Sequence, residues 1–410
     1  MRNDMALERS VDTTLNVALI SRPMLAVLAA QFLSALADNA LLFAAIALLR
    51  SLAHYEDWHA PLLQEFFVLA FIVFAPFVGP LADSLPKGRV MMIGNGCKFI
   101  GAVAMLAGLN PWLAYGLVGL GAAAYSPAKY GILRQLVGAE NLIKANSLME
   151  GSTIVAILLG AVLGGWLADI SVHTALLSVA ACYLLAALSN LLIPRLPPEH
   201  PLHRVHPAEM TRDFGRALST LFRNRDARFS LIGTSLFWGS GATLRLLLVA
   251  WVPVALLISD NQTPANLSGA VAVGIALGAL LAARFITLSS VNRALYPGLL
   301  LGVAVMALAQ IHDMYPAIAL LLLIGACGGM FVVPLNALLQ ERGHETVGAG
   351  HAVAVQNFCE NLTMLLLVGL YTLLLGTSIS ITHIAFGFGA LILLGMLCLV
   401  WMRRKTTRPD

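Results

Sequence analysis

Long apolar runs, separated by short polar or Gly/Pro-containing segments, follow one another along almost the whole chain. These runs predict twelve membrane-spanning helices, at about residues 24–49, 62–82, 89–107, 112–133, 147–168, 174–193, 229–257, 267–288, 294–311, 315–340, 350–375 and 382–402. A spanning helix needs about 20 mostly apolar residues, and most of these runs are long enough to cross a bilayer with some tilt. The pattern therefore predicts an all-α membrane protein.

The composition agrees with this prediction and excludes several classes of protein. Apolar residues make up 59% of the chain and charged residues 11%, whereas charged residues average about 25% in soluble domains. The net charge of +4 lies in short connections rather than on one soluble face, so we expect no nucleic-acid partner. The five cysteines lie in apolar runs without a C-x-x-C pair, so neither a disulfide framework nor a metal site is expected. The N-terminal segment lacks a small-residue cleavage pattern, so we expect no removable signal peptide.

Lys and Arg residues concentrate at both termini and in every second connection, whereas the other connections hold only Arg50. Cytoplasmic connections carry this excess in membrane proteins. Both termini are therefore predicted to be cytoplasmic. Three cations, Lys98, Lys129 and Arg245, fall inside predicted helices instead.

The only long connection, residues 194–228, divides the predicted helices into six and six. We therefore predict an N-terminal six-helix bundle at 1–193, a cytoplasmic linker at 194–228 and a C-terminal six-helix bundle at 229–410.

A weak repeat supports this division. Gly121 and Pro127 of the fourth predicted helix recur 207 residues later as Gly328 and Pro334 of the tenth. Together with the six-plus-six pattern, this repeat favours a duplicated bundle of the major facilitator kind, with a binding site at the interface of the halves.

Asp38 lies in the middle of the first predicted helix. A charge at the centre of a bilayer costs about 2.5–3.5 kcal/mol on insertion scales, so such a residue is a candidate functional site. Gln31, Ser34 and Asp38 share one helical face, with Asn39 at its edge. The alternative is a structural polar contact between helices, which membrane bundles often use.

The segment from Gly79 to Arg89 resembles the G-x3-D…G-R loop signature of the major facilitator superfamily, with altered spacing. Asp83 at a helix end, followed by Lys87 and Arg89, is predicted to pair with neighbours or helix termini and so gate one conformation. Alternatively, these charges serve only membrane topology.

The cations inside predicted helices have several possible roles. Lys129 shares a face with Ser126 and is either an anion ligand or a lysine that snorkels to the surface. Arg245 lies too deep to snorkel easily, and its guanidinium can bind phosphate or carboxylate in bidentate fashion. Its partner is either a substrate or Asp38. Lys98, nearer the cytoplasmic side, is assigned a structural or gating role.

The eleventh predicted helix carries a broad polar face formed by Gln356, Asn357, Glu360 and Asn361. Glu360 has three possible roles: it binds an ammonium group, takes up a proton, or pairs with a basic residue. Each half thus supplies a deep acid and an inward base, so the site suits a zwitterion.

Four stretches, at residues 31–43, 75–79, 124–133 and 333–343, resemble the bacterial lysophospholipid transporter family. This resemblance implies a major facilitator fold in the inner membrane. It implies a flippase that moves lysophospholipids, such as lysophosphatidylethanolamine and lysophosphatidylglycerol, from the outer to the inner leaflet by alternating access. It also implies functional coupling to an acyltransferase and acyl-carrier-protein synthetase that reacylates them.

The residues suit such a substrate. In this hypothesis Arg245 and Lys129 hold the phosphate, while Asp38 and Glu360 contact the amine or lock the bases between cycles. The complete set of predicted substrate-binding residues is Asp38, Asn39, Lys129, Arg245, Gln356, Asn357 and Glu360.

Two other functions compete with this hypothesis. A proton-coupled exporter of drugs or small metabolites would use Asp38 or Glu360 as its proton carrier. A membrane enzyme such as an acyltransferase is disfavoured because the sequence has no His-x4-Asp pair and no H-E-x-x-H motif. A pump driven by ATP is disfavoured because the sequence has no G-x4-G-K-[ST] loop. We therefore expect neither catalysis nor a cofactor.

Overall fold

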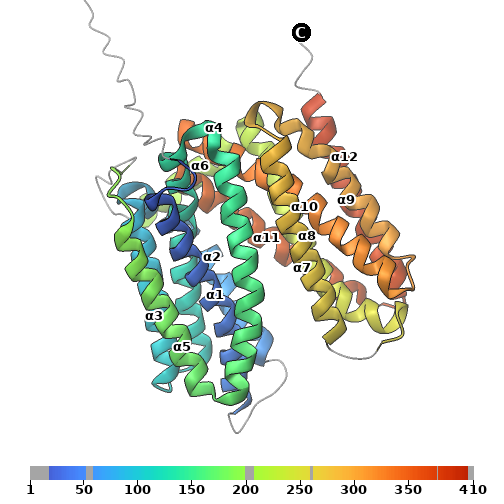
Figure 1. The fold of residues 1–410 in the computed structure, drawn as a ribbon. Coiled ribbons are helices and arrows are strands. Elements are labelled where there is room, and N and C mark those ends of the chain that lie inside the picture. Colours follow the sequence, from blue (N-terminus) through green and yellow to red (C-terminus); the bar gives the residue numbers. More distant parts are fainter. Residues whose placement is uncertain (1–17, 52–58, 199–206, 259–261, 376, 405–410) are drawn as a thin grey trace, which may run out of the picture.

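The computed structural model describes residues 18–51, 59–198, 207–258, 262–375 and 377–404, and their regular secondary structure is helical (Figure 1). The first half consists of α1 (Arg22–Arg50), α2 (His59–Ser84), α3 (Lys87–Leu106), α4 (Pro111–Ile170) and α5 (Val172–Ser189), followed by a 3-10 turn at Asn190–Leu192. The second half consists of α7 (Arg225–Ala255), α8 (Gln262–Phe285), a 3-10 helix at Leu288–Ala294, α9 (Leu295–Leu308), α10 (Met314–Thr346), α11 (Ala349–Leu375) and α12 (Ile381–Arg404). Another helix, α6 (Pro207–Arg223), lies between the halves in sequence.

The long element α4 contains two of the predicted spans. Its helical geometry is interrupted at Gly138, whose φ of 70° and ψ of 177° suit glycine. A Cβ on Gly88 would contact Ile193, so the chain after α5 lies beside the start of α3. α4 therefore runs along the first half in one direction, reverses near Gly138 and runs back in the other.

Eleven helices of the described residues are long and apolar enough to span a membrane, with α4 counted once. Because α4 holds both the fourth and the fifth predicted spans, the prediction of a twelve-span all-α protein is confirmed. Several of the Lys and Arg residues used to predict the orientation lie outside the described residues, as does the N-terminal segment. Among them are Arg2, Arg9, Arg204, Lys405 and Arg408.

The two halves stand side by side (Figure 1). α1 begins and α12 ends at the same end of the molecule, which we call the termini side. The halves meet at this side and spread apart toward the opposite end (Figure 1). Contacts between the halves come mainly from α2 with α11 and from α4 with α8, α10 and α11.

Small residues allow close backbone packing within each half. A Cβ on Gly160 of α4 would lie 2.4 Å from the Leu36 carbonyl oxygen of α1, and one on Gly278 of α8 would lie 2.0 Å from the Ala326 carbonyl oxygen of α10. Membrane helices, which lack a hydrophobic driving force between them, associate through such close contacts. Each half is therefore tightly packed within itself.

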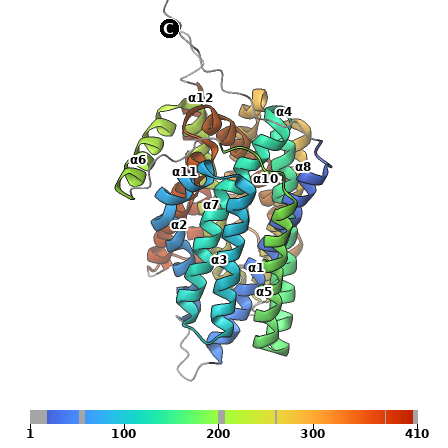
Figure 2. The same cartoon turned by 90° about the vertical axis from the view of Figure 1, so that its left-hand side faces the viewer.

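Helix α6 lies in the predicted linker, where no helix was expected. Four apolar residues at helical spacing, Met210, Phe214, Ala217 and Leu221, are buried against the rest of the protein. α6 packs on α2 of the first half and on α7 and α11 of the second, and Figure 2 shows it beside the ends of α2 and α11. The Phe214 and Phe358 rings meet edge to face, with centroids 5.6 Å apart. The linker helix thus bridges the two halves on the termini side.

Candidate transport site

Asp38 forms the centre of a polar cluster within the first half. Its Oδ2 lies 2.7 Å from Lys98 Nζ of α3, and its Oδ1 accepts a hydrogen bond of 2.8 Å from the Tyr183 hydroxyl of α5. Lys98 Nζ also donates to Ser34 Oγ at 3.0 Å, and Ser34 donates to Asn95 Oδ1 at 2.8 Å. Three helices therefore hold one ion pair in a fixed geometry.

The two charges of this pair differ in exposure. The Lys98 side chain is 2% exposed and that of Asp38 is 24% exposed. The Lys98 ammonium also lies 5.2 Å from the centroid of the Tyr125 ring and 5.8 Å from that of Tyr183, within cation–π range. Lys98 therefore neutralises Asp38 from the buried side.

The sequence analysis did not identify Lys98 as the partner of Asp38. The two residues are 60 positions apart on different helices, so no local pattern connects them. The available signal was general: an ionised carboxylate inside a membrane helix requires a cation nearby. Of the three cations within the predicted helices, Lys98 fills this role.

Glu360 lies in a second cluster, on α11. It is buried, and its Oε1 accepts a hydrogen bond of 2.7 Å from Gln356 Nε2. The same amide nitrogen donates to Asn336 Oδ1 of α10 at 2.7 Å. Gln356 therefore orients Glu360 and ties α11 to α10.

Lys129 of α4 connects the two clusters electrostatically. Its side chain is 9% exposed, and its ammonium lies 4.2 Å from the centroid of the Tyr130 ring. It interacts with the charges of Glu150, Asp38 and Glu360. This burial contradicts the alternative of a lysine that snorkels to the surface. Lys129 is thus a buried cation that feels the charges of acids from both halves.

Arg245 differs from the other candidate charges because it is exposed. It lies on the same face of α7 as Trp238, which is 37% exposed, and Gly241, where an added Cβ would meet no atom within 4 Å. Asp38 pairs with Lys98 and Glu360 binds Gln356, so neither acid pairs with Arg245 in the described part of the chain. The possibility that Asp38 is the partner of Arg245 is therefore not realised.

The two predicted asparagines lie in different surroundings. Asn39 donates to the Ala35 carbonyl of its own helix at 2.8 Å and packs against Gly160 of α4. Asn357 of α11 donates to Ser126 Oγ of α4 at 2.9 Å. Asn357 therefore links the halves, whereas Asn39 belongs to the packing of the first half.

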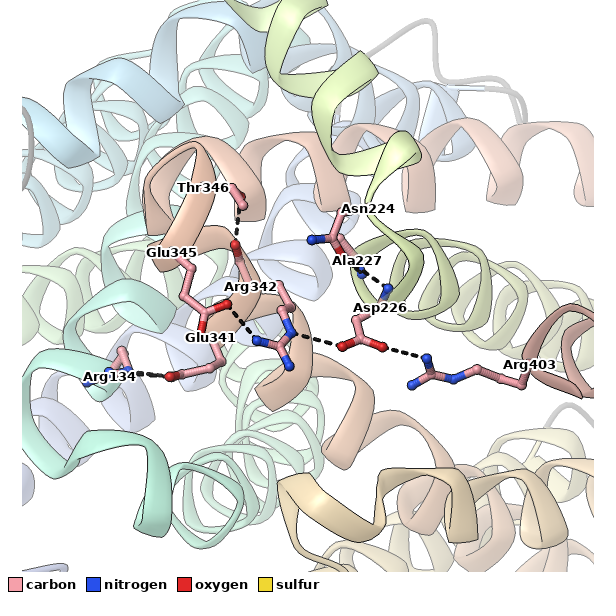
Figure 3. Close-up of polar contacts among 9 residues, drawn as sticks. All are labelled: Arg134, Asn224, Asp226, Ala227, Glu341, Arg342, Glu345, Thr346 and Arg403. Carbon is pink, nitrogen blue, oxygen red and sulfur yellow. Dashed lines mark hydrogen bonds and ion pairs between the residues drawn. The ribbon is translucent and has the colours of Figure 1, made fainter. Parts of the chain in front are cut away.

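Further contacts between the halves lie closer to the termini side. Asn146 and Gln340 exchange two hydrogen bonds, of 3.1 and 2.8 Å. Arg134 of α4 forms an ion pair with Glu341 of α10, through both Nε and Nη2 (Figure 3). We call these two contacts, together with Ser126–Asn357, the seal.

Asp83 adds a contact between the halves at the N-terminus of α11. Its Oδ1 accepts from the Gly350 amide at 2.7 Å and its Oδ2 from the His351 amide at 3.0 Å, while His351 Nδ1 lies 2.7 Å from Oδ2. A carboxylate suits the positive dipole of a helix N-terminus and its amides, which have no partner within the helix. Lys87 Nζ lies 3.5 Å from Asp83, and both side chains are buried. Arg89 is exposed on the first turn of α3, so this geometry gives it no part in the contact.

A charge network that the sequence analysis missed lies beside the seal (Figure 3). Arg342 donates from Nε to Asp226 Oδ2 at 2.9 Å and from Nη1 to Glu345 at 2.6 Å. Arg403 of α12 donates to the other oxygen of Asp226. Thus Glu341 binds the first half, whereas the next residue, Arg342, anchors the end of α10 to α7 of its own half.

Comparisons with known proteins define the family. The model of the Major Facilitator Superfamily matches residues 27–368. The chain is 54% identical over 399 residues to the lysophospholipid transporter LplT of Escherichia coli O1:K1 / APEC, covering 97% of this chain and 100% of the relative. The chain belongs to the lysophospholipid transporter family of this superfamily. The LplT of Shigella boydii serotype 4 (strain Sb227) matches with the same identity and coverage.

Solved structures share the fold of this family member. The human organic anion transporter MFSD10 (TETRAN) superposes with a TM-score of 0.74 at 17% identity, covering 92% of this chain and 99% of that one. The major facilitator transporter FucP in its outward conformation gives a TM-score of 0.72 at 15% identity, covering 94% and 99%. The predicted major facilitator fold is therefore confirmed.

Proposed function

We propose that this protein moves lysophospholipids from the outer to the inner leaflet of the bacterial inner membrane by alternating access. The observation that carries the proposal is the 54% identity to LplT over the full length of that relative. The chemistry of the site supports it, because a lysophospholipid brings a phosphate, in some cases an amine, and one acyl chain. A site for this lipid needs a base to bind the phosphate, an acid to bind the amine and an apolar surface for the acyl chain.

Five of the seven predicted substrate-binding residues have a place in this proposal. The exposed guanidinium of Arg245 binds the phosphate, for which its planar fork is suited. Lys129 lies deeper, between acids of both halves, and takes the phosphate as the headgroup advances. Asp38, which pairs with Lys98, and Glu360, which Gln356 holds in place, contact the amine where the headgroup carries one.

The distribution of Lys and Arg supports cytoplasmic termini. With that orientation the seal lies on the cytoplasmic side, and the helices spread apart toward the outer leaflet. The lysophospholipid then enters from the outer leaflet. Its release requires that the seal and the Asp83 contact break while the opposite ends of the halves close.

The proposed product is a lysophospholipid in the inner leaflet, which still carries the hydroxyl vacated by its lost acyl chain. An acyltransferase and acyl-carrier-protein synthetase is the proposed functional partner, because it consumes this product. The transporter itself performs no covalent chemistry in this scheme and uses no cofactor.

Uptake of labelled lysophosphatidylethanolamine by vesicles that contain Arg245→Ala tests the proposal. Loss of a charge-assisted hydrogen bond is worth about 1.5–3 kcal/mol, so uptake should fall by about ten- to a hundredfold. Arg212→Ala, which removes an exposed arginine of α6, should transport normally. Unchanged uptake by Arg245→Ala would reject the role of Arg245. Wild-type vesicles that ignore lysolipids and export another compound only under a proton gradient would favour the exporter.

A further inference from the structure

We propose that Lys98 sets the headgroup range of the transport site by balancing the charge of Asp38, which would otherwise attract the amine of a zwitterionic headgroup and repel an anionic one. With Lys98 in place, the site accepts headgroups with and without an amine. This inference rests on the proposed lysophospholipid transport, and it assigns to Lys98 a specificity role that the sequence analysis did not foresee.

The surroundings of the Lys98 ammonium match those that recognise alkylammonium ligands. One carboxylate oxygen of Asp38 lies 2.7 Å away and Ser34 Oγ lies 3.0 Å away. The rings of Tyr125 and Tyr183 flank it at 5.2 and 5.8 Å. A carboxylate combined with aromatic faces is the usual way to bind an organic ammonium group. We call these four groups, from Asp38, Ser34, Tyr125 and Tyr183, the ammonium cage, and the Lys98 ammonium lies within it.

Lys98 does not use all the hydrogen-bonding groups in and beside the ammonium cage. Among the described residues, the Tyr125 hydroxyl and Asn95 Nδ2 are buried without a hydrogen-bond partner, which is unfavourable inside a protein. Both groups lie on the buried side with Lys98, since Asn95 is 0% and Tyr125 3% exposed. The cage therefore has hydrogen-bonding capacity beyond what the lysine uses.

The two members of the ion pair are reached from different sides. Lys98 is 2% exposed and approaches from within the first half, whereas Asp38 is 24% exposed. Tyr183 holds Oδ1 of the carboxylate in place. A headgroup therefore approaches the exposed side of the Asp38 carboxylate, while Lys98 neutralises the carboxylate charge from the buried side.

This charge balance determines which headgroups the site tolerates. Beside the neutral Asp38–Lys98 pair, a glycerol headgroup with a net negative phosphate is not repelled, and an ethanolamine amine can still contact Asp38. Without the lysine charge, a bare carboxylate attracts the amine and repels the anionic lipid. Without the Asp38 charge, the remaining lysine favours the anionic lipid. The two single substitutions should therefore shift selectivity in opposite directions.

The test measures vesicle uptake of lysophosphatidylethanolamine and lysophosphatidylglycerol of the same acyl chain. Lys98→Gln should raise the ratio of ethanolamine to glycerol lipid by about tenfold, equivalent to about 1.4 kcal/mol. Asp38→Asn should lower this ratio, and the double variant Asp38→Asn/Lys98→Gln should return it toward the wild-type value. Lys144→Gln, which removes an exposed lysine of α4, should leave the ratio unchanged.

A purely structural role for Lys98 gives a different result: both lipids slow equally in Lys98→Gln, and the ratio stays constant. That outcome, or a shift of the same sign in both single variants, would overturn the inference while leaving lysolipid transport intact. If Lys98→Gln does not fold, the direction of the shift in Asp38→Asn decides. Failure of the wild type to take up either lipid would instead overturn the proposed function itself.

Discussion

Arg134 of α4 and Glu341 of α10 form an ion pair across the two halves, and they lie 207 residues apart in the sequence. The same offset relates Pro127 to Pro334. The ion pair thus joins corresponding positions of the internal repeat, one carrying a base and the other an acid. Opposite charges thus stand at the place where the two halves meet.

Substitution of Glu341 should loosen the seal. Its ion pair with Arg134 is largely shielded, with side chains 14% and 11% exposed, so Glu341→Ala should destabilise the closed seal by about 1–3 kcal/mol. Alkylation of a single cysteine introduced at Ser126 should become faster, because Ser126 lies at the interface. The charge-swapped variant Arg134→Glu/Glu341→Arg should slow it again. Asp213→Ala, which breaks the exposed pair with Arg216, is the matched control and should have no effect.

Asp83 should stabilise the first turn of α11 from the opposite half. Asp83→Ala removes the acceptor of the Gly350 and His351 amides, and loss of a helix cap costs about 0.5–2 kcal/mol. Hydrogen exchange of these two amides should accelerate, whereas exchange in the middle of α11 should not. Equal protection in wild type and variant would contradict the capping role.

The packing of α6 should protect the linker. Phe214 is 7% exposed and contacts Phe358, and a buried Phe→Ala substitution costs about 3–5 kcal/mol. Phe214→Ala should therefore release α6, and trypsin should cleave after Arg212 and Arg216 more rapidly. Ser219→Ala, on the exposed face of the same helix, should keep the wild-type cleavage rate. Unchanged cleavage in Phe214→Ala would show that Phe214 does not hold α6 in place.

Gln356 should support transport through Glu360. Gln356→Leu removes a hydrogen bond to the buried Glu360 carboxyl group, and such a bond is worth about 0.5–1.5 kcal/mol. Lysolipid uptake should fall by about two- to tenfold. Thr372→Ala removes an exposed hydroxyl bonded to its own helix and should transport normally. Unaltered uptake by Gln356→Leu would show that transport does not depend on the hydrogen bond between Gln356 and Glu360.

The sequence predicted the fold well because a bilayer imposes length and apolarity on each span separately. α11 therefore begins and ends within one residue of the predicted bounds, whereas α10 ends at Thr346, six residues after its predicted end. The sequence analysis did not predict α6, although the spacing of Met210, Phe214, Ala217 and Leu221 carried a helical signal. The charges of the linker obscured that pattern.

The sequence identifies the buried charges of the candidate site but not their pairings. The cost of burying a charge in a membrane singles out Asp38, Lys129 and Glu360 from local sequence alone. The pairing of Asp38 with Lys98 depends on how α1 packs on α3, and the separation of Arg245 from both acids depends on the orientation of α7. These are tertiary relationships that one sequence does not encode in any short pattern.

The central claim is that lysophospholipid crosses between the halves when the seal opens. Leaflet-resolved uptake of labelled lysophosphatidylethanolamine by Arg134→Cys/Glu341→Cys, with the five native cysteines replaced, tests it most directly. A reducible bifunctional cross-linker between the two introduced cysteines should stop uptake, and reduction should restore it. Uptake that continues unchanged through the cross-linked protein would contradict the account.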